Sequence, residues 1–187
     1  SQFPELEHGY CAKIGGVSKG IYSSLNLGLN SYDNKQDILK NFQILANDLE
    51  ISKNNIIILN QYHSNQVLNF TKKDNYTKLY YKADAIITNL RNIAISVFTA
   101  DCVPLLIYAK DVSYIAAIHA GWHGAFTGII ENSIKKLAAL GANIAELHIA
   151  VMPSITEDSY EVDLIFYENF IGKNQSYISY FKKNSRE

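Results

Sequence analysis

Residues 93–124 constrain this chain most, because two apolar runs there lead into residues that bind metals or act as nucleophiles. The run Ile93–Phe98 leads to Cys102, and the run Tyr114–Ile118 leads to His119. Runs of this kind, rich in Ile and Val and free of charge, are typical of strands buried on both faces. Open α/β sheets place their sites at the ends of such strands. A thiol and an imidazole on two strand ends therefore predict one shared site.

Length and composition limit the class of protein. With 187 residues, 48% of them hydrophobic, the chain is long enough for one domain with a sizeable core. Seventeen basic and eighteen acidic residues leave a formal charge of −1, which gives no electrostatic reason to expect nucleic acid or a membrane surface as a partner. Two cysteines and the lack of an apolar stretch of about 20 residues predict a cytoplasmic protein without a membrane span. The oligomeric state is not predicted.

Hydrophobic periodicity and turn residues predict strands that alternate with helices in a mixed α/β fold. Strands are predicted at Leu6–Lys13, Ile56–Leu59, Val67–Phe70, Ala83–Thr88, Ile93–Phe98, Tyr114–Ile118 and Leu147–Met152. An exposed loop is predicted at Thr71–Lys82. One helix is predicted to begin at the N-cap residue Asp33, a second to run from after Gly124 to a C-cap at Gly141, and a third to span Asp163–Phe170.

His63, Cys102 and His119 form a candidate metal site, because each follows a buried apolar run and lies in a short polar patch. One cysteine with two histidines is a normal zinc ligand set that leaves a fourth position for water. Zinc lowers the pKa of bound water to about 7, which supplies a nucleophile at neutral pH. The spacing alone is a weak signal, since no short Cys-x-x-Cys or His-x-x-x-His pair joins all three. His119 and His123 are four residues apart, but Gly121 and Gly124 favour a turn there over a continuous helix.

Other roles for these residues stay open at this point. Cys102 is also a candidate nucleophile with His119 as its base, as in a cysteine hydrolase, or an inert buried thiol. Asp84 and Asp101 are candidates for orienting a ligand imidazole or carrying a proton, and equally for forming turns at strand ends. Trp122 is suited either to stacking on a planar ligand or to filling the core.

Several separated motifs resemble those of the YfiH/YlmD-like proteins, also called polyphenol oxidase or laccase-domain proteins. In the family's order they are Gly15–Ser18 with Ser24–Gly28, Gln61–His63, Ala83–Ala85, Thr99–Cys102, His119–Trp122, and Pro153–Ile155 with Tyr160–Val162. Together they cover about residues 8–162. The resemblance implies a three-layer α/β/α sandwich around a mixed sheet, forming a single domain over residues 1–187.

The resemblance also implies a metal and an activity. It implies one zinc per chain held by His63, Cys102 and His119, with copper as the alternative metal. It implies phosphorolysis of adenosine, inosine, guanosine or methylthioadenosine, with a purine nucleoside and phosphate as the small-molecule partners. Deamination of adenosine is implied as well. The other readings are a copper-dependent polyphenol oxidase, a cysteine hydrolase, and a catalytically degraded homologue that serves as a binding domain.

Further site residues follow from the same resemblance. Proton transfer is implied for Asp101 and His123, and substrate binding for four polar residues: Lys13, Ser18, Asn26 and Gln61. Lys13, Phe42 and His123 stand where the family usually has arginine. Arginine is the side chain best shaped to hold phosphate with two hydrogen bonds, so we expect phosphorolysis to be weakened more than deamination.

Overall fold

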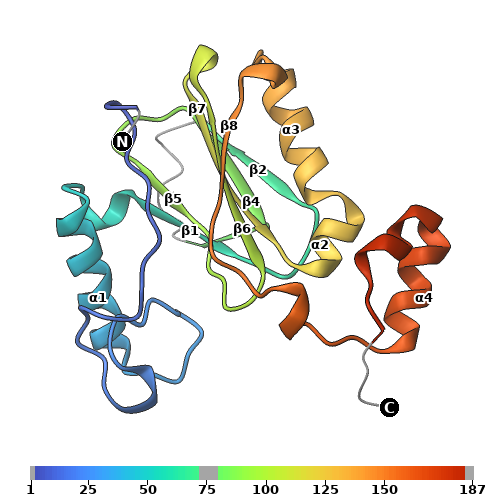
Figure 1. The fold of residues 1–187 in the computed structure, drawn as a ribbon. Coiled ribbons are helices and arrows are strands. Elements are labelled where there is room, and N and C mark those ends of the chain that lie inside the picture. Colours follow the sequence, from blue (N-terminus) through green and yellow to red (C-terminus); the bar gives the residue numbers. More distant parts are fainter. Residues whose placement is uncertain (1–2, 72–79, 184–187) are drawn as a thin grey trace.

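The computed structural model describes residues 3–71 and 80–183, and Figure 1 shows strands gathered between helices on either side. The α-helices are α1 (Lys35–Asp48), α2 (Trp122–Thr127), α3 (Ile129–Ala139) and α4 (Leu164–Lys173). The strands are β1 (Ile56–Asn60), β2 (Val67–Phe70), β3 (Tyr80–Lys82), β4 (Ala85–Thr88), β5 (Ala94–Ser96), β6 (Val103–Ala109), β7 (Tyr114–Ala120) and β8 (His148–Val151). A 3₁₀ helix, η7 (Gln175–Tyr180), follows α4.

The strands form two sheets. The smaller sheet has the order β3-β1-β5 and is parallel throughout. The larger sheet has the order β2-β4-β7-β6-β8, in which only the β2–β4 pair is parallel. Since β6 and β7 are antiparallel neighbours, the start of β6 and the end of β7 meet at one edge, where Val103 pairs with Ala120. This register brings the chain on either side of Cys102 and His119 together.

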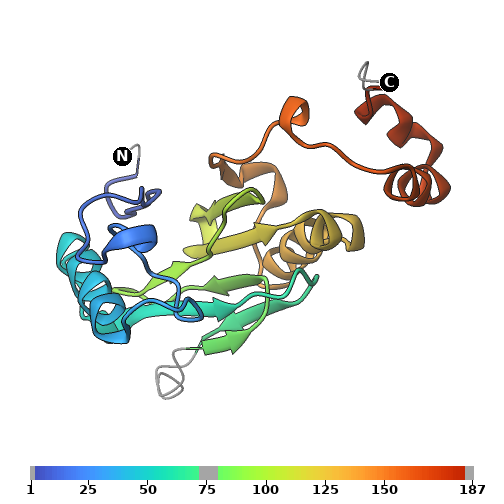
Figure 2. The ribbon, with the colours of Figure 1, turned by 90° about the horizontal axis from the view of Figure 1, so that it is seen from below.

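Alternating side chains on the strands fill three apolar layers. On β1, Ile57 and Leu59 pack toward the larger sheet, while Ile56 and Ile58 pack toward α1. Successive strand residues point to opposite faces, which gives this division. The other face of the larger sheet packs against α3. The layers therefore run α1, smaller sheet, larger sheet and α3, as the view from below in Figure 2 shows.

The C-terminal residues leave this sandwich. After β8 the chain runs past the sheet edge to α4, which projects to one side of the layers in both views (Figures 1 and 2). No residue of α4 is fully buried. Aromatic rings contribute to its contact with the rest of the molecule, with Trp122 and Phe126 of α2 against Phe166 and Phe170 of α4.

The mixed α/β fold is confirmed, and the middle of the sandwich is built from two sheets where one was expected. Gly141 follows α3 with a left-handed φ of 97°, as expected of a C-terminal glycine. Asp163 caps α4 by accepting a hydrogen bond from Phe166 N. Among the described residues, no helix is both long and apolar enough to cross a membrane.

One predicted strand is absent, and two strands were not predicted. Leu6–Lys13 forms no strand, because this segment pairs with no sheet edge and is exposed except at Leu6. The predicted loop Thr71–Lys82 lies outside the described residues over 72–79, and its last three residues form β3, which pairs in parallel with β1. Strand β6 was not predicted, and Cys102 lies between β5 and β6, directly before the first residue of β6. Pro104 obscured β6, and it is tolerated there because it lies near the strand's beginning.

The helix boundaries also differ from expectation. Asn34, one residue after Asp33, caps α1 by accepting a hydrogen bond from Gln36 N. The helix expected after Gly124 begins at Trp122 and is divided into α2 and α3 by Gly128, whose φ is 93°. Gly124 lies inside α2 and not in a turn, and a Cβ there would come within 2.8 Å of Ser64 O. The glycine lets α2 approach the loop between β1 and β2.

Candidate metal centre

His63, Cys102 and His119 converge at the edge where β6 begins and β7 ends. Their ligand atoms all lie within 4.8 Å of one another. Cys102 Sγ is 3.8 Å from His63 Nε2, and the rings of His63 and His119 meet edge to face with centroids 4.9 Å apart. His63 lies in the loop after β1, Cys102 directly precedes β6, and His119 is part of β7.

The spacing of these atoms fits one bound cation. Zinc–nitrogen and zinc–sulfur bonds of about 2.1 and 2.3 Å at a tetrahedral angle separate the two ligand atoms by about 3.6 Å. The observed 3.8 Å between Cys102 Sγ and His63 Nε2 is close to that value. Three protein ligands leave one position for water or substrate, which is the arrangement of catalytic zinc sites.

Asp84 holds two of the three residues in place from beneath. Its carboxylate is fully buried and accepts a hydrogen bond from His119 Nδ1 at 2.9 Å. Because an ionised carboxylate only accepts, this contact favours the His119 tautomer with its proton on Nδ1, which leaves Nε2 available to bind a metal. The backbone N–H of His119 also donates to the carbonyl oxygen of Asp84 at 2.7 Å.

The same carboxylate gathers the loop that carries His63. The backbone N–H groups of Tyr62, His63 and Ser64 all donate to it, as does the Ser64 hydroxyl at 2.7 Å. His63 has a left-handed φ of 60°, a conformation that turns successive N–H groups toward one anion. Burial raises the pKa of Asp84, but the hydrogen bonds from Ser64, His119 and Tyr62 outweigh it and leave that pKa below its ordinary value. Asp84 is therefore the orienting carboxylate, one of the roles considered for it.

Gly121 allows the three residues to meet. A Cβ at this position would lie 2.5 Å from His63 Cδ2 and 3.1 Å from Cys102 Sγ. Real Cβ atoms do not approach other atoms so closely, so any other residue would push His63 and Cys102 apart. The glycine of the His119–Trp122 motif is thus required by close packing against the candidate ligands.

The surroundings of Cys102 do not suit a nucleophile. Burial, and next the carboxylates of Asp101 and Asp84, raise the pKa of the Cys102 thiol. A nucleophilic cysteine needs a lowered pKa, normally from a neighbouring cation or a helix N-terminus. A thiol crowded by two imidazoles and near two carboxylates is better suited to binding a cation. The cysteine-hydrolase reading loses support here.

Asp101, His123 and Gln61 lie around this centre in different ways. Asp101 is exposed beside Cys102, and its backbone carbonyl accepts a hydrogen bond from Ile155 N. His123, on α2, donates from Nδ1 to the carbonyl oxygen of His63 at 2.8 Å. Both ends of the Gln61 amide are bonded to the backbone of Phe98, at 2.7 Å each, so its polar atoms fix the chain after β5.

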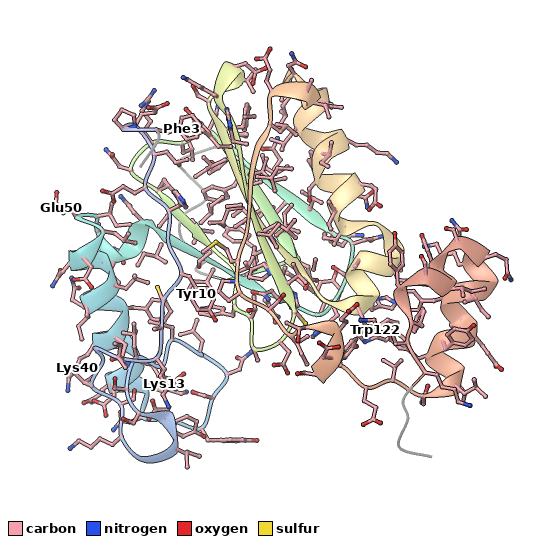
Figure 3. The ribbon with its side chains drawn as sticks, in the orientation of Figure 1. Phe3, Tyr10, Lys13, Lys40, Glu50 and Trp122 are labelled. Atoms are coloured by element: carbon pink, nitrogen blue, oxygen red, sulfur yellow. The ribbon has the colours of Figure 1, made fainter. Side chains whose placement is uncertain are left out.

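Lys13, Ser18 and Asn26 belong to a separate cluster built on α1. Asn41 is fully buried at its centre, donating to Ser18 Oγ and to the carbonyl oxygen of Asn26, and accepting from Val17 N. Within the described residues, the side-chain hydrogen bonds of this cluster do not involve His63, Cys102 or His119. Figure 3 shows Lys13 on the α1 side of the molecule and Trp122 on the opposite side.

The polar groups of that cluster are used within it. The amide of Asn26 donates to Ser31 Oγ and Asp33 Oδ2 and accepts from Gly28 N. The Lys13 carbonyl accepts hydrogen bonds from Ser24 and Leu25. These contacts explain the first family motif as the folding of a loop onto α1. Substrate binding by Lys13, Ser18 and Asn26 stays a prediction.

Phe42 has a structural role. Its side chain is 4% exposed and packs with Ile38, Ala46, Ile56 and Ile58 between α1 and the smaller sheet. A phosphate-binding arginine would not be directed into that apolar layer. The structure therefore gives no support to the expectation that Phe42 replaces a phosphate-binding arginine.

Sequence reasoning missed Ser64, Asn41 and the part played by Gly121. Ser64 could have been found from its position directly after His63, since serines at loop bends often accept and donate hydrogen bonds to nearby groups. Asn41 lies on the buried face of α1 with Ile38 and Phe42, and a polar residue at such spacing among apolar ones is a signal for a buried amide. Nothing in the sequence shows that Ser64 and His119 share one carboxylate.

Residues 7–187 match the model of the family described as multi-copper polyphenol oxidoreductase laccase. A Corynebacterium glutamicum protein named purine nucleoside phosphorylase is 34% identical over 82% of this chain and 62% of its own length. The Bacillus subtilis purine nucleoside phosphorylase YlmD is 31% identical over 85% of this chain and 60% of its own length. This chain therefore spans about three fifths of these relatives.

A solved structure gives the same picture of the fold. A Neisseria meningitidis protein superposes with a TM-score of 0.79 and 29% identity, over 93% of this chain and 68% of that one. The resemblance to YfiH/YlmD-like proteins is confirmed by these matches.

Proposed function

Because this chain belongs to the family of multi-copper polyphenol oxidoreductase laccase proteins, and relatives in it are named purine nucleoside phosphorylase, we propose that it acts on purine nucleosides at a site with one zinc. The observation that carries the proposal is the convergence of His63, Cys102 and His119 over the buried carboxylate of Asp84. A carboxylate behind a ligand imidazole fixes the ring and raises its basicity toward a metal.

Zinc is favoured over copper by the number of ligands. A multi-copper enzyme needs a separate set of ligands for each of its metal sites. Among the described residues, one group of side chains has a geometry suitable for a metal, and it consists of His63, Cys102 and His119. The whole chain has five histidines, and two of them are used in this cluster. One cysteine and two histidines with an open fourth position form an ordinary catalytic zinc set.

The proposed reactions are phosphorolysis of adenosine, inosine, guanosine or methylthioadenosine, and deamination of adenosine. Bound zinc would act as a Lewis acid and lower the pKa of an oxygen nucleophile. In phosphorolysis a phosphate oxygen attacks C1′ of the ribose, the C1′–N9 bond breaks, and the departing base takes a proton. His123 and Asp101 are the proposed proton carriers, because each stands next to a candidate ligand.

We expect phosphorolysis to be the weaker activity. His123 stands where the family usually has arginine, and it is already bonded to the His63 carbonyl through Nδ1. Loss of one hydrogen bond to a charged group costs about 1.5–3 kcal/mol, or roughly one to two powers of ten in rate or affinity. Deamination does not need a bound phosphate, so it escapes that loss. His123→Arg should raise phosphorolysis.

Metal analysis and nucleoside turnover test the proposal together. Wild-type protein should hold close to one zinc per chain, and His119→Ala should lose it. Zinc retained in full by His119→Ala would reject the site, and preferential copper loading with phenol oxidation would reject the zinc reading. If zinc-loaded protein turns over no purine nucleoside, with or without phosphate, the proposed activity is rejected. The alternative of a catalytically degraded homologue that serves as a binding domain would then be favoured.

A further inference from the structure

A groove lined by aromatic rings lies beside the metal centre, between α2 and α4. Its volume is about 240 Å³. Trp122 and Phe126 line it from α2, and Phe166 and Phe170 line it from α4. Pockets for whole drug-sized ligands are about 300–1,000 Å³, so this groove suits one flat ring system better than a complete nucleoside.

The aromatic walls pack against each other and still leave a ring open to solvent. Trp122 meets Phe166 edge to face with centroids 5.1 Å apart, and Phe166 stacks on Phe170 at 4.7 Å. Even so, Trp122 is 46% exposed. In Figure 3 it lies between the sheets and the C-terminal helix. Exposed faces of aromatic side chains are the surfaces on which nucleobases stack.

Polar side chains line the groove beside the aromatic rings. Asn169 lines it from α4 and is exposed, so its amide is open to solvent and to a ligand. His123 lines it from α2, and because its Nδ1–H donates to His63 O, its Nε2 is an acceptor. An amide that both donates and accepts is the usual partner of a purine edge.

The groove is next to the candidate ligands. Trp122 directly follows Gly121, whose Cβ position is 3.1 Å from Cys102 Sγ, and consecutive Cα atoms are about 3.8 Å apart. His123 joins the groove to the His63 loop through a 2.8 Å hydrogen bond. His123 therefore belongs both to the groove lining and to the contacts of the loop that carries His63.

From this arrangement, and resting on the proposed function, we propose that the groove between α2 and α4 binds the purine base of the substrate. The base stacks on the aromatic surface that includes Trp122, and Asn169 hydrogen-bonds to its edge. Asn169 is then a specificity-determining residue, and the ribose faces His63, Cys102 and His119.

Trp122 provides a direct readout, because it is the only tryptophan in the chain. Free hypoxanthine, adenine and inosine should quench its fluorescence in the zinc-loaded protein, and ribose should not. Asn169→Ala should raise the Kd for the bases roughly fivefold to tenfold, the effect of one hydrogen bond. Asn169→Asp should change the order of preference between adenine and hypoxanthine.

A neighbouring residue supplies the matched control. Glu168 is exposed on α4 and does not line the groove, so Glu168→Ala should bind bases as the wild type does. Base binding unchanged in Asn169→Ala, or a loss of equal size in Glu168→Ala, would overturn the assignment of Asn169. Turnover of nucleosides without quenching by bases would overturn the groove while leaving the proposed function intact. Quenching by bases without any turnover would support the groove and count against the proposed function.

Discussion

Asp84→Asn tests whether one buried carboxylate assembles the metal centre. In the wild type, Oδ2 accepts from the Ser64 N–H and hydroxyl at 2.7 Å each, and Oδ1 accepts from His119 Nδ1 at 2.9 Å and His63 N at 3.0 Å. An amide has one acceptor oxygen, so in either orientation its NH₂ group faces a donor. The less costly orientation keeps the oxygen toward His63 and His119 and leaves the Ser64 N–H unpaired.

The cost follows from that orientation. A buried donor without a partner costs about 1–3 kcal/mol, and the bond to His119 loses about 1 kcal/mol when its acceptor becomes neutral. We therefore expect Asp84→Asn to lower the free energy of unfolding of the metal-free protein by roughly 2–4 kcal/mol. Zinc affinity should fall about tenfold to a hundredfold, as for other carboxylates that orient ligand histidines.

Urea unfolding in the presence of a chelator measures the first quantity, and competition with a coloured zinc chelator measures the second. Asp101→Asn is the matched control, since Asp101 is exposed and only its backbone is bonded. An Asp84→Asn protein with the urea midpoint and zinc affinity of the wild type would refute the assembly role. Equal losses in Asp101→Asn would point to a general effect of charge instead.

Three further outcomes are expected. Gly121→Ala should weaken zinc binding about tenfold or more by chelator competition, because overpacking costs about 1–3 kcal/mol, while Gly172→Ala, with open space at its Cβ, should not. Phe42→Arg should lower the melting temperature sharply without improving phosphate use, because its site is an apolar layer. The hydrogen bond from Ser18, with those from Asn26 and Asn34, holds the pKa of Asp33 below its ordinary value. The ionised Asp33 therefore stabilises the fold above about pH 4, and this stabilisation is lost as the pH falls further. In urea titrations, Asp33→Asn should lose less stability on acidification than the wild type does.

Much of the fold was predictable because it follows from local pattern. The apolar runs at β1, β4 and β7 are short and continuous, which is the pattern of strands that are buried on both faces of a sheet. Strand β3 was not predictable in that way, because its three residues are defined by pairing with β1 and not by their own composition. Strand β6 was hidden by Pro104, whose position at the strand's beginning only the pairing with β7 reveals.

The candidate site was predictable in part. His63, Cys102 and His119 were proposed because each follows an apolar run and lies in a polar patch, and because the family resemblance implies the same three residues. The structure brings them together. Their mutual distances depend on the antiparallel register of β6 and β7, which the sequence does not contain. The carboxylate of Asp84 had several possible roles in the sequence, and its role became clear only from the donors around it.

The way α4 is attached has a consequence for the groove. Helices without fully buried residues are the parts of a protein that open before the core does, and α4 is one of these. Lys173 ties the end of α4 to α2 by donating to the Phe126 carbonyl and lying over its ring at 4.0 Å. Because α4 forms one wall, any opening of α4 would remove the groove and lower the apparent affinity of the proposed base site by the fraction of molecules that are open. Amide exchange in α4 should accordingly slow when a base is bound, while exchange in β7 stays unchanged.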